Sequence, residues 1–276
     1  MKLSCLPVSL YDDIFSGKCT VVDWINLAHD LGLDGVDFSI KFFPDRDVDK
    51  INSICSMLTK CGIEACMIAC YSDFTHPDNT KRAEELENLK SDIKLARDLG
   101  AKFVRVTAGQ KHPGIKHADG IQWVADGFRY ALDEAQKHGI TLAYENHTKG
   151  APWQYWDFSQ PSEIFLEILN ILSDTPLGVC FDTANPLVLK EDVLDLFNKV
   201  LDRIVVLHIF DMKEVGKFEP VRVGTGVSPI QEILTQLHKA EYDGWISIEE
   251  ASRQARKGFE ESVEYVRNTW NRTLTS

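Results

Sequence analysis

Residues Thr141–His147, with the sequence TLAYENH, decide the fold prediction, because a short apolar run ends there in a carboxylate, an amide and an imidazole. The same pattern occurs three more times downstream, where LGVCF precedes Asp182, IVVL precedes His208 and WISI precedes Glu249. One carboxylate after an apolar run is common, since strand ends meet water. Four runs that end in glutamate, aspartate, histidine and glutamate offer the oxygen and nitrogen ligands that suit a divalent metal ion.

Outward from this stretch, apolar runs typical of strands alternate with amphipathic segments typical of helices. The strand candidates are residues 3–10, 34–40, 63–70, 102–108, 141–145, 177–182, 203–210 and 245–250. The helix candidates are residues 20–31, 48–61, 81–99, 119–138, 162–172, 192–201, 229–240 and 253–270. Eight such units favour an α/β protein with one domain over residues 1–276, a closed (β/α)8 TIM barrel rather than an open doubly wound sheet.

Four candidate ligands share one position in this predicted barrel. Functional side chains of (β/α)8 barrels stand at the carboxyl ends of the strands, and Glu145, Asp182, His208 and Glu249 end the last four predicted strands. Neighbouring strands lie about 4.8 Å apart, so four adjacent strand ends can converge on a single ion. The spacing therefore predicts a metal site at the barrel mouth.

Composition and charge limit the classes of function. The chain has 276 residues, is 44% hydrophobic and carries a formal net charge of −12. This charge argues against nucleic acid or an anionic membrane as a partner. The amino terminus is a poor signal peptide and no apolar run reaches the roughly 20 residues that span a bilayer, so a cytoplasmic protein is expected. Seven cysteines, an odd number, agree with a reducing compartment.

Several longer motifs resemble a known family. They are FTHPD at Phe74–Asp78, DLGAKFVRVTAG at Asp98–Gly109, AYENH at Ala143–His147, FDTAN at Phe181–Asn185 and LHIFD at Leu207–Asp211. Over nearly the whole chain they are similar to the xylose isomerase-like TIM barrels called sugar phosphate isomerases/epimerases. That group also contains tagatose 3-epimerase-type enzymes, hydroxypyruvate isomerase, inosose dehydratase and, more distantly, endonuclease IV.

The resemblance implies a site and a chemistry. It implies that Glu145, Asp182, His208 and Glu249 bind one divalent metal ion, and that Glu145 and Glu249 exchange protons with a small-molecule carbohydrate. We expect Mn²⁺, with Mg²⁺, Co²⁺ or Zn²⁺ as alternatives. Proton transfer next to a carbonyl needs a base, an acid and a group that stabilises the enediolate charge, and two glutamates beside a metal ion supply all three.

Two departures from the family pattern leave the substrate open. Asn185 stands where many ketose epimerases have a histidine, and GTG at Gly224–Gly226 stands where many have GEG. No arginine follows a few residues after His208. An asparagine can hydrogen-bond a hydroxyl group but carries no positive charge, so we predict Asn185 as a substrate contact without fixing the sugar.

Three further residues are predicted to contact substrate from the barrel interior or its loops. His147 would share the face of Glu145, or else cap a loop. Arg105 lies between two valines of a strand, where it must either reach a carboxylate or the substrate inside the barrel or extend outward to water. Trp153 could form a wall against a sugar ring, or pack against its own barrel or a partner subunit.

Three loop residues complete the candidate contacts. His76 in FTHPD reaches substrate or fixes a turn. Asp211 orients the imidazole of His208 or a neighbouring lysine, or is a simple loop aspartate. Arg222 meets a phosphate or carboxylate of the substrate, or is a solvated charge.

Four other functions compete with the isomerase or epimerase. A metal-dependent dehydratase acting on a keto-sugar or inosose begins with the same proton abstraction. Glycoside hydrolysis uses paired carboxylates but needs no metal, and repair of the endonuclease IV type needs more histidines. A barrel that only binds a sugar or a partner protein is the alternative without catalysis. The sequence also leaves a homo-oligomer open.

Overall fold

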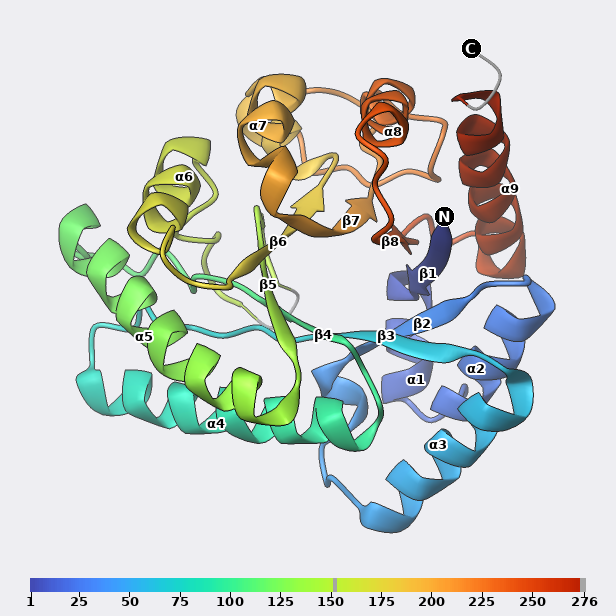
Figure 1. Ribbon diagram of the computed structural model, residues 1–276, viewed down its shortest axis with the longest axis horizontal. Helices are drawn as coiled ribbons and strands as arrows, with labels where there is room; N and C mark the ends of the chain where they lie inside the picture. The colour runs from blue at the N-terminus through green and yellow to red at the C-terminus, as the bar shows by residue number, and fades with distance from the viewer. Residues whose placement is uncertain (151–152, 274–276) are drawn as a thin grey trace.

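The computed structural model describes residues 1–150 and 153–273. Its strands form a ring with the larger helices outside it, as Figure 1 shows. All strand pairs are parallel, in the order β1-β8-β7-β6-β5-β4-β3-β2. The strands are β1 (Lys2–Leu6), β2 (Gly35–Ser39), β3 (Glu64–Ala69), β4 (Phe103–Val106), β5 (Thr141–Glu145), β6 (Gly178–Asp182), β7 (Ile204–Ile209) and β8 (Trp245–Glu249). The predicted single-domain (β/α)8 barrel is therefore confirmed.

The helices that cover the barrel follow the predicted segments closely. They are α2 (Val21–Asp30), α3 (Val48–Cys61), α4 (Asn79–Asp98), α5 (His117–His138), α6 (Ser162–Ile171), α7 (Val193–Val200), α8 (Ile230–Lys239) and α9 (Ala255–Thr273). Local chemistry sets several ends. The Thr20 and Asp23 side chains form a capping box at the start of α2. Gly62 and Gly139 end α3 and α5 in the left-handed conformation, which glycine adopts without steric cost.

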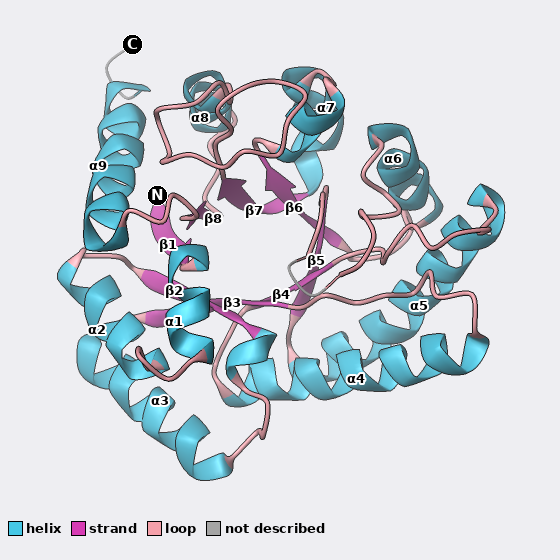
Figure 2. Cartoon of the chain, turned by 180° about the vertical axis from the view of Figure 1, so that it is seen from behind, coloured by secondary structure: helices cyan, strands magenta, loops and turns pink. Residues whose placement is uncertain are grey.

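The first predicted strand was too long. Residues 3–10 were expected to be one strand, but β1 ends at Leu6 and is followed by η1 (Val8–Leu10) and a short helix, α1 (Tyr11–Phe15). Pro7 separates them, because proline has no N–H group for a strand ladder. Figure 2 shows α1 inside the ring of larger helices. Further 3-10 turns are η2 (Ile40–Phe42), η3 (Asn185–Leu189) and η4 (Leu201–Arg203).

The barrel is nearly closed, with a seam between β1 and β2. These strands stand at the two ends of the ladder order, and the backbone N–H of Asp34 donates to the Leu3 carbonyl across the seam at 2.9 Å. Inside the barrel, the hydroxyls of Ser4 and Ser247 donate to the carboxylate of Asp37. These side-chain hydrogen bonds connect β2 to β1 and β8, where the backbone ladder that joins the other strands is missing from the strand order.

Apolar side chains fill the space between the strands and the outer helices. Trp24, Phe128, Phe165, Phe197 and Phe259 are among the largest of these fully buried side chains. No helix in the described part of the chain combines the length and apolar character that crossing a membrane requires. Several other buried polar side chains gather at the carboxyl ends of β4 to β8, which positions the site described next.

Candidate metal and active site

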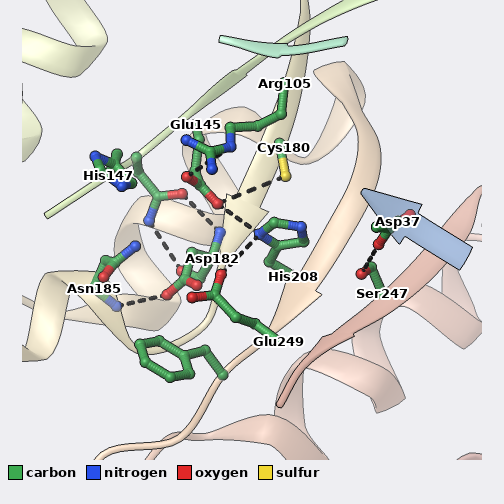
Figure 3. Close-up of polar contacts among 12 residues, drawn as sticks. Asp37, Arg105, Glu145, His147, Cys180, Asp182, Asn185, His208, Ser247 and Glu249 are labelled. Atoms are coloured by element: carbon green, nitrogen blue, oxygen red, sulfur yellow. Dashed lines mark hydrogen bonds and ion pairs between the residues drawn. The ribbon is translucent and has the colours of Figure 1, made fainter. Parts of the chain in front are cut away.

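The four predicted ligands meet at the mouth of the barrel. Glu145, Asp182, His208 and Glu249 come from the neighbouring strands β5, β6, β7 and β8, and in Figure 3 their side chains point toward one another. Each offers one ligand atom, and these atoms all lie within 4.8 Å of one another. In the strand register Asp182 lies directly opposite His208, which explains why residues far apart in sequence converge.

His208 is the centre of the cluster. Its Nδ1 lies 2.6 Å from Oε1 of Glu145 and 3.4 Å from Oε2 of Glu249, so Nδ1 is the nitrogen that faces the carboxylates. The side chain of Glu145 is 1% exposed, whereas that of Glu249 is 20% exposed. Glu249 is therefore the glutamate of the pair that a bound molecule reaches more easily.

Asp182 is positioned by its own backbone environment. Its Oδ1 accepts hydrogen bonds from the backbone N–H groups of Ala184 at 2.8 Å and Asn185 at 2.7 Å. Its Oδ2 is buried and has no hydrogen-bond partner among the described residues. An unpaired buried carboxylate oxygen is costly, and a cation would satisfy it. The donor set and this unpaired oxygen both fit a divalent metal ion.

Asn146 holds the ends of two ligand strands together. Its side-chain Nδ2 donates to the Asp182 carbonyl at 2.9 Å, and its Oδ1 accepts from the Asp182 backbone N–H at 2.7 Å. These two bonds continue the pairing of β5 with β6 beyond the last paired residues, Glu145 and Cys180. The sequence analysis assigned no role to this amide, although its place between Glu145 and His147 was visible in TLAYENH.

The charged side chains of the cluster shift one another's pKa values. Burial alone would raise the pKa of Glu145, but Arg105, with its Nε 3.5 Å from Oε2, and His208 lower it to about 2. Burial and the charges of Glu249 and Glu145 raise the pKa of Asp182 well above its usual range. Burial and Glu145 also raise the pKa of Glu249, although His208 opposes them. The two glutamates thus stand in different electrostatic environments.

Cys180 lies beside the cluster, one layer deeper in the barrel. Its Sγ is 3.9 Å from Oε1 of Glu145, and it forms a second group of buried ligand-capable side chains with Glu145 and His208. Burial raises the pKa of its thiol to about 12. The sequence analysis missed this residue, because it treated the apolar run LGVCF as packing alone.

A pocket of about 460 Å³ opens at this end of the barrel. Glu249, Arg105 and His147 contribute to its lining, so the pocket reaches the candidate metal ligands. His147 is buried, its Nδ1 lies 3.2 Å from Oδ2 of Asp157, and the ring of Trp153 packs against it edge-on with centroids 5.3 Å apart. The pocket therefore gives a small molecule access to Glu249, whose ligand atom lies within 4.8 Å of those of the other three candidate ligands.

Comparison with known proteins places the chain in a family. A family model described as xylose isomerase-like TIM barrel matches residues 25–269. The chain belongs to this family. A curated relative, the putative L-ribulose-5-phosphate 3-epimerase SgbU of Escherichia coli (strain K12), is 24% identical over 271 residues, which cover 91% of this chain and 90% of the relative. Its name supports the predicted isomerase or epimerase class of enzyme.

Two solved structures share the fold. The probable 3-DHS dehydratase AsbF from Bacillus anthracis superposes with a TM-score of 0.79 at 16% identity and covers 97% of this chain and 99% of its own. The IOLI protein with a binding zinc atom also gives a TM-score of 0.79 at 16% identity and covers 100% of this chain and 98% of its own. At 16% identity these similarities show that the barrel fold is shared and carry no information about activity.

Within this xylose isomerase-like barrel, Arg105, His147, Trp153 and Asn185 lie near the cluster. Arg105 points inward to Glu145, the choice that the sequence left open. Asn185 is buried next to Asp182, and its Oδ1 accepts a hydrogen bond from the Thr148 hydroxyl. Their contact with a substrate stays a prediction.

The three loop candidates are engaged elsewhere. The carboxylate of Asp211 accepts hydrogen bonds from the backbone N–H groups of Gly224, Gly226 and Ser228. It therefore holds the GTG loop in place. Arg222 pairs with Glu261 of α9 at 3.0 Å.

His76 behaves as the turn residue that the sequence offered as its alternative. Its Nδ1 accepts the backbone N–H of Asp78 at 3.1 Å, and its carbonyl accepts from Arg82. The contacts of His76, Asp211 and Arg222 thus lie within loops or with a helix, and their contact with a substrate stays a prediction.

Two tyrosines of the pocket were missed by the sequence analysis. Tyr71 lies two residues after β3 and Tyr11 begins α1, and both line the pocket with Arg105. Both carried a usable signal, since each comes directly after a predicted strand, residues 63–70 or residues 3–10. The structure places Tyr11 in a short helix instead of at a strand end.

Proposed function

We propose that the protein is a metal-dependent sugar isomerase or epimerase that moves a proton next to the carbonyl of a ketose, an aldose or a related polyol. The observation that carries this proposal is the convergence of Glu145, Asp182, His208 and Glu249, whose ligand atoms lie within 4.8 Å of one another beside an open pocket. The epimerase name of the relative agrees with this chemistry.

One divalent ion would be held by these four side chains. Three carboxylates and one imidazole suit Mn²⁺, our first choice, and also Mg²⁺, Co²⁺ or Zn²⁺. When bound, the ion supplies Lewis-acid stabilisation of negative charge on the substrate oxygens. The Oδ2 of Asp182, which has no hydrogen-bond partner among the described residues, and the Nδ1 of His208, which faces the carboxylates, are well placed to bind the ion.

Glu145 and Glu249 would transfer the proton. They stand on β5 and β8, at opposite ends of the four-strand group, so they approach a bound molecule from different sides. Glu249 is the more exposed of the two, and the ion pair with Arg105 holds Glu145 in place. A base and an acid on different sides of one carbon are what isomerisation or epimerisation through an enediolate requires.

The neighbouring polar residues would orient the substrate. His147 lines the pocket, and its contact with Asp157 fixes which ring nitrogen faces the cavity. Trp153 supports that imidazole, and Asn185 lies beside Asp182. A cytoplasmic location, a homo-oligomer and the absence of nucleic acid or membrane partners stay predictions from the sequence.

A metal-dependent dehydratase is the second candidate. The His147–Asp157 pair favours it, because an imidazole oriented by a carboxylate can protonate a departing hydroxyl group. Dehydration lowers the mass of the product by one water, whereas epimerisation leaves the mass unchanged. Product analysis by mass spectrometry therefore separates the two functions.

Solvent isotope exchange tests the shared first step. The protein is supplied with Mn²⁺ in D₂O together with a panel of ketoses and inososes, and deuterium incorporation is measured by NMR. We expect incorporation at the carbon next to the carbonyl for at least one compound, and its loss in Glu249→Gln. The proposal would be contradicted if product formed without deuterium uptake and Glu249→Gln remained fully active.

A further inference from the structure

The walls of the pocket differ in their chemistry. Glu249 lines one wall and provides hydrogen-bond acceptors, and the other three candidate ligands lie close behind it, with ligand atoms within 4.8 Å of one another. Tyr11, Tyr71 and Arg105 form another and provide hydrogen-bond donors. We call this second group the donor wall. It comes from α1, the end of β3 and β4, whereas the ligands come from β5 to β8.

Arg105 is the strongest donor of this wall and is incompletely paired. It is 2% exposed, and its ion pair among the described residues, from Nε to Oε2 of Glu145, spans 3.5 Å. Nε and Nη1 donate no hydrogen bond to any described residue. The guanidinium also lies over the ring of Tyr71, 4.7 Å from its centroid, which fixes its plane. A buried guanidinium with unused N–H groups lacks an acceptor.

The tyrosines add hydroxyl groups next to this guanidinium. The Tyr11 hydroxyl is buried and has no hydrogen-bond partner in the described chain. Burial and the neighbouring Tyr71 raise the pKa of Tyr11 well above its usual range, so its hydroxyl stays a donor. Two unsatisfied donors of different residues thus line one side of the same cavity.

We propose that the donor wall binds a carboxylate of the substrate, so that the enzyme acts on a sugar acid rather than on a neutral sugar. This inference rests on the proposed isomerase or epimerase function and deepens it. A planar carboxylate matches the guanidinium fork, which donates two parallel N–H bonds to it, and it retains lone pairs for the tyrosine hydroxyl.

The position of Arg105 also locates the carboxylate along the sugar chain. Because Nε of Arg105 lies 3.5 Å from Oε2 of Glu145, the bound carboxylate sits close to the carbons that exchange a proton. The pocket also has two more exposed cations, Lys149 and Arg253. Arg253 is 82% exposed and 3.9 Å from Asp12, so a substrate phosphate would belong at the mouth rather than on the donor wall.

Binding of matched polyols tests the inference. D-gluconate and D-glucitol differ only in a carboxylate in place of a hydroxymethyl group, and neither requires turnover. With the Mn²⁺-supplied protein in a calorimeter, we expect gluconate to bind at least about tenfold more tightly. Tyr11→Phe and Tyr71→Phe should each reduce gluconate affinity about tenfold, and Arg105→Lys should reduce it further. Tyr130→Phe, on the exposed face of α5, should change nothing.

Three results would overturn the inference. Equal binding of gluconate and glucitol removes the preference for an acid. A gluconate affinity that is unchanged in both tyrosine variants places its carboxylate elsewhere, for example on the metal ion. Tighter binding of D-glucitol 6-phosphate than of gluconate that is lost in Tyr11→Phe and Arg105→Lys assigns the donor wall to a phosphate.

The experiment separates this inference from the proposed function. Deuterium exchange on neutral ketoses with no preference for acids would leave the isomerase chemistry intact and contradict the carboxylate site. If gluconate binding depends on Tyr11 and Tyr71 but the protein exchanges no deuterium, the carboxylate site stands and the isomerase chemistry is contradicted.

Discussion

The two sides of the pocket are built from different halves of the barrel. The half from β5 to β8 ends in three carboxylates and one histidine that share a cluster, whereas β3, β4 and α1 supply the guanidinium and phenol groups of the donor wall. Acceptors on one side and donors on the other hold a molecule in a single orientation. The pocket is therefore suited to a substrate that presents hydrogen-bond donors at one end and a hydrogen-bond acceptor, such as a carboxylate, at the other.

The largest expected effect is on proton transfer by Glu249, in the half of the barrel from β5 to β8. Glu249→Gln keeps the size of the side chain but removes the base, so the rate of deuterium exchange should fall by about 10²–10⁴-fold. The exchange rate is measured by NMR on the compound that the wild-type protein processes best. Glu264→Gln, at an exposed position of α9, is the matched control, and an equal loss in this variant would refute the assignment.

The next effect concerns the ion pair that joins the two sides. Arg105→Met leaves the buried carboxylate of Glu145 without its cation, and breaking such a pair costs about 3–5 kcal/mol of unfolding free energy. Urea unfolding without added metal measures it. The double variant Arg105→Met/Glu145→Gln should regain much of the loss, since no charge remains unpaired. Additive losses in the double variant would show that the two residues are not coupled.

A smaller effect is expected at Asn146, whose side chain joins the ends of β5 and β6. Asn146→Ala removes both hydrogen bonds to the Asp182 backbone and should lower the unfolding free energy by about 1–3 kcal/mol. The affinity for Mn²⁺ should fall about 10–100-fold, because Asp182 is held less firmly. Both are read from urea unfolding and calorimetry. Asn170→Ala, at an exposed position of α6, should affect neither.

The last effect is a change of stability with pH that comes from the carboxyl group of Glu85 in α4. Burial, together with the charges of Asp73 and Asp92, raises the pKa of Glu85 to about 7, in contrast to Glu145. Between about pH 4.5 and pH 7 the folded state then binds more protons than the unfolded state, so stability falls as the pH rises, by at most about 1.4 kcal/mol per pH unit. Glu85→Gln should remove this part of the slope, and an unchanged slope would contradict it.

The fold was largely predictable because each element is specified locally. The strand β5 and the helix α3 have the predicted bounds, Thr141–Glu145 and Val48–Cys61, since apolar runs and left-handed glycines mark their ends. The same alternation placed Glu145, Asp182, His208 and Glu249 at strand ends, and a closed barrel brings such ends together.

The donor wall was harder to predict because it depends on contacts between distant segments. Arg105 could face inward or outward from sequence alone, and only the carboxylate of Glu145 and the ring of Tyr71 decide its direction. Tyr11 enters the pocket because Pro7 ends β1 early. Conversely, Asp211 had the right position in sequence, but loop N–H groups occupy its carboxylate.

The central claim is that Glu145, Asp182, His208 and Glu249 bind one divalent ion, and metal stoichiometry tests it most directly. Elemental analysis of the purified protein after dialysis against Mn²⁺ should give one ion per chain, which EDTA removes with a fall in melting temperature. Asp182→Asn should retain the fold but lose the ion and the response to EDTA. No bound metal in the wild-type protein, or the same metal content in Asp182→Asn, would contradict the account.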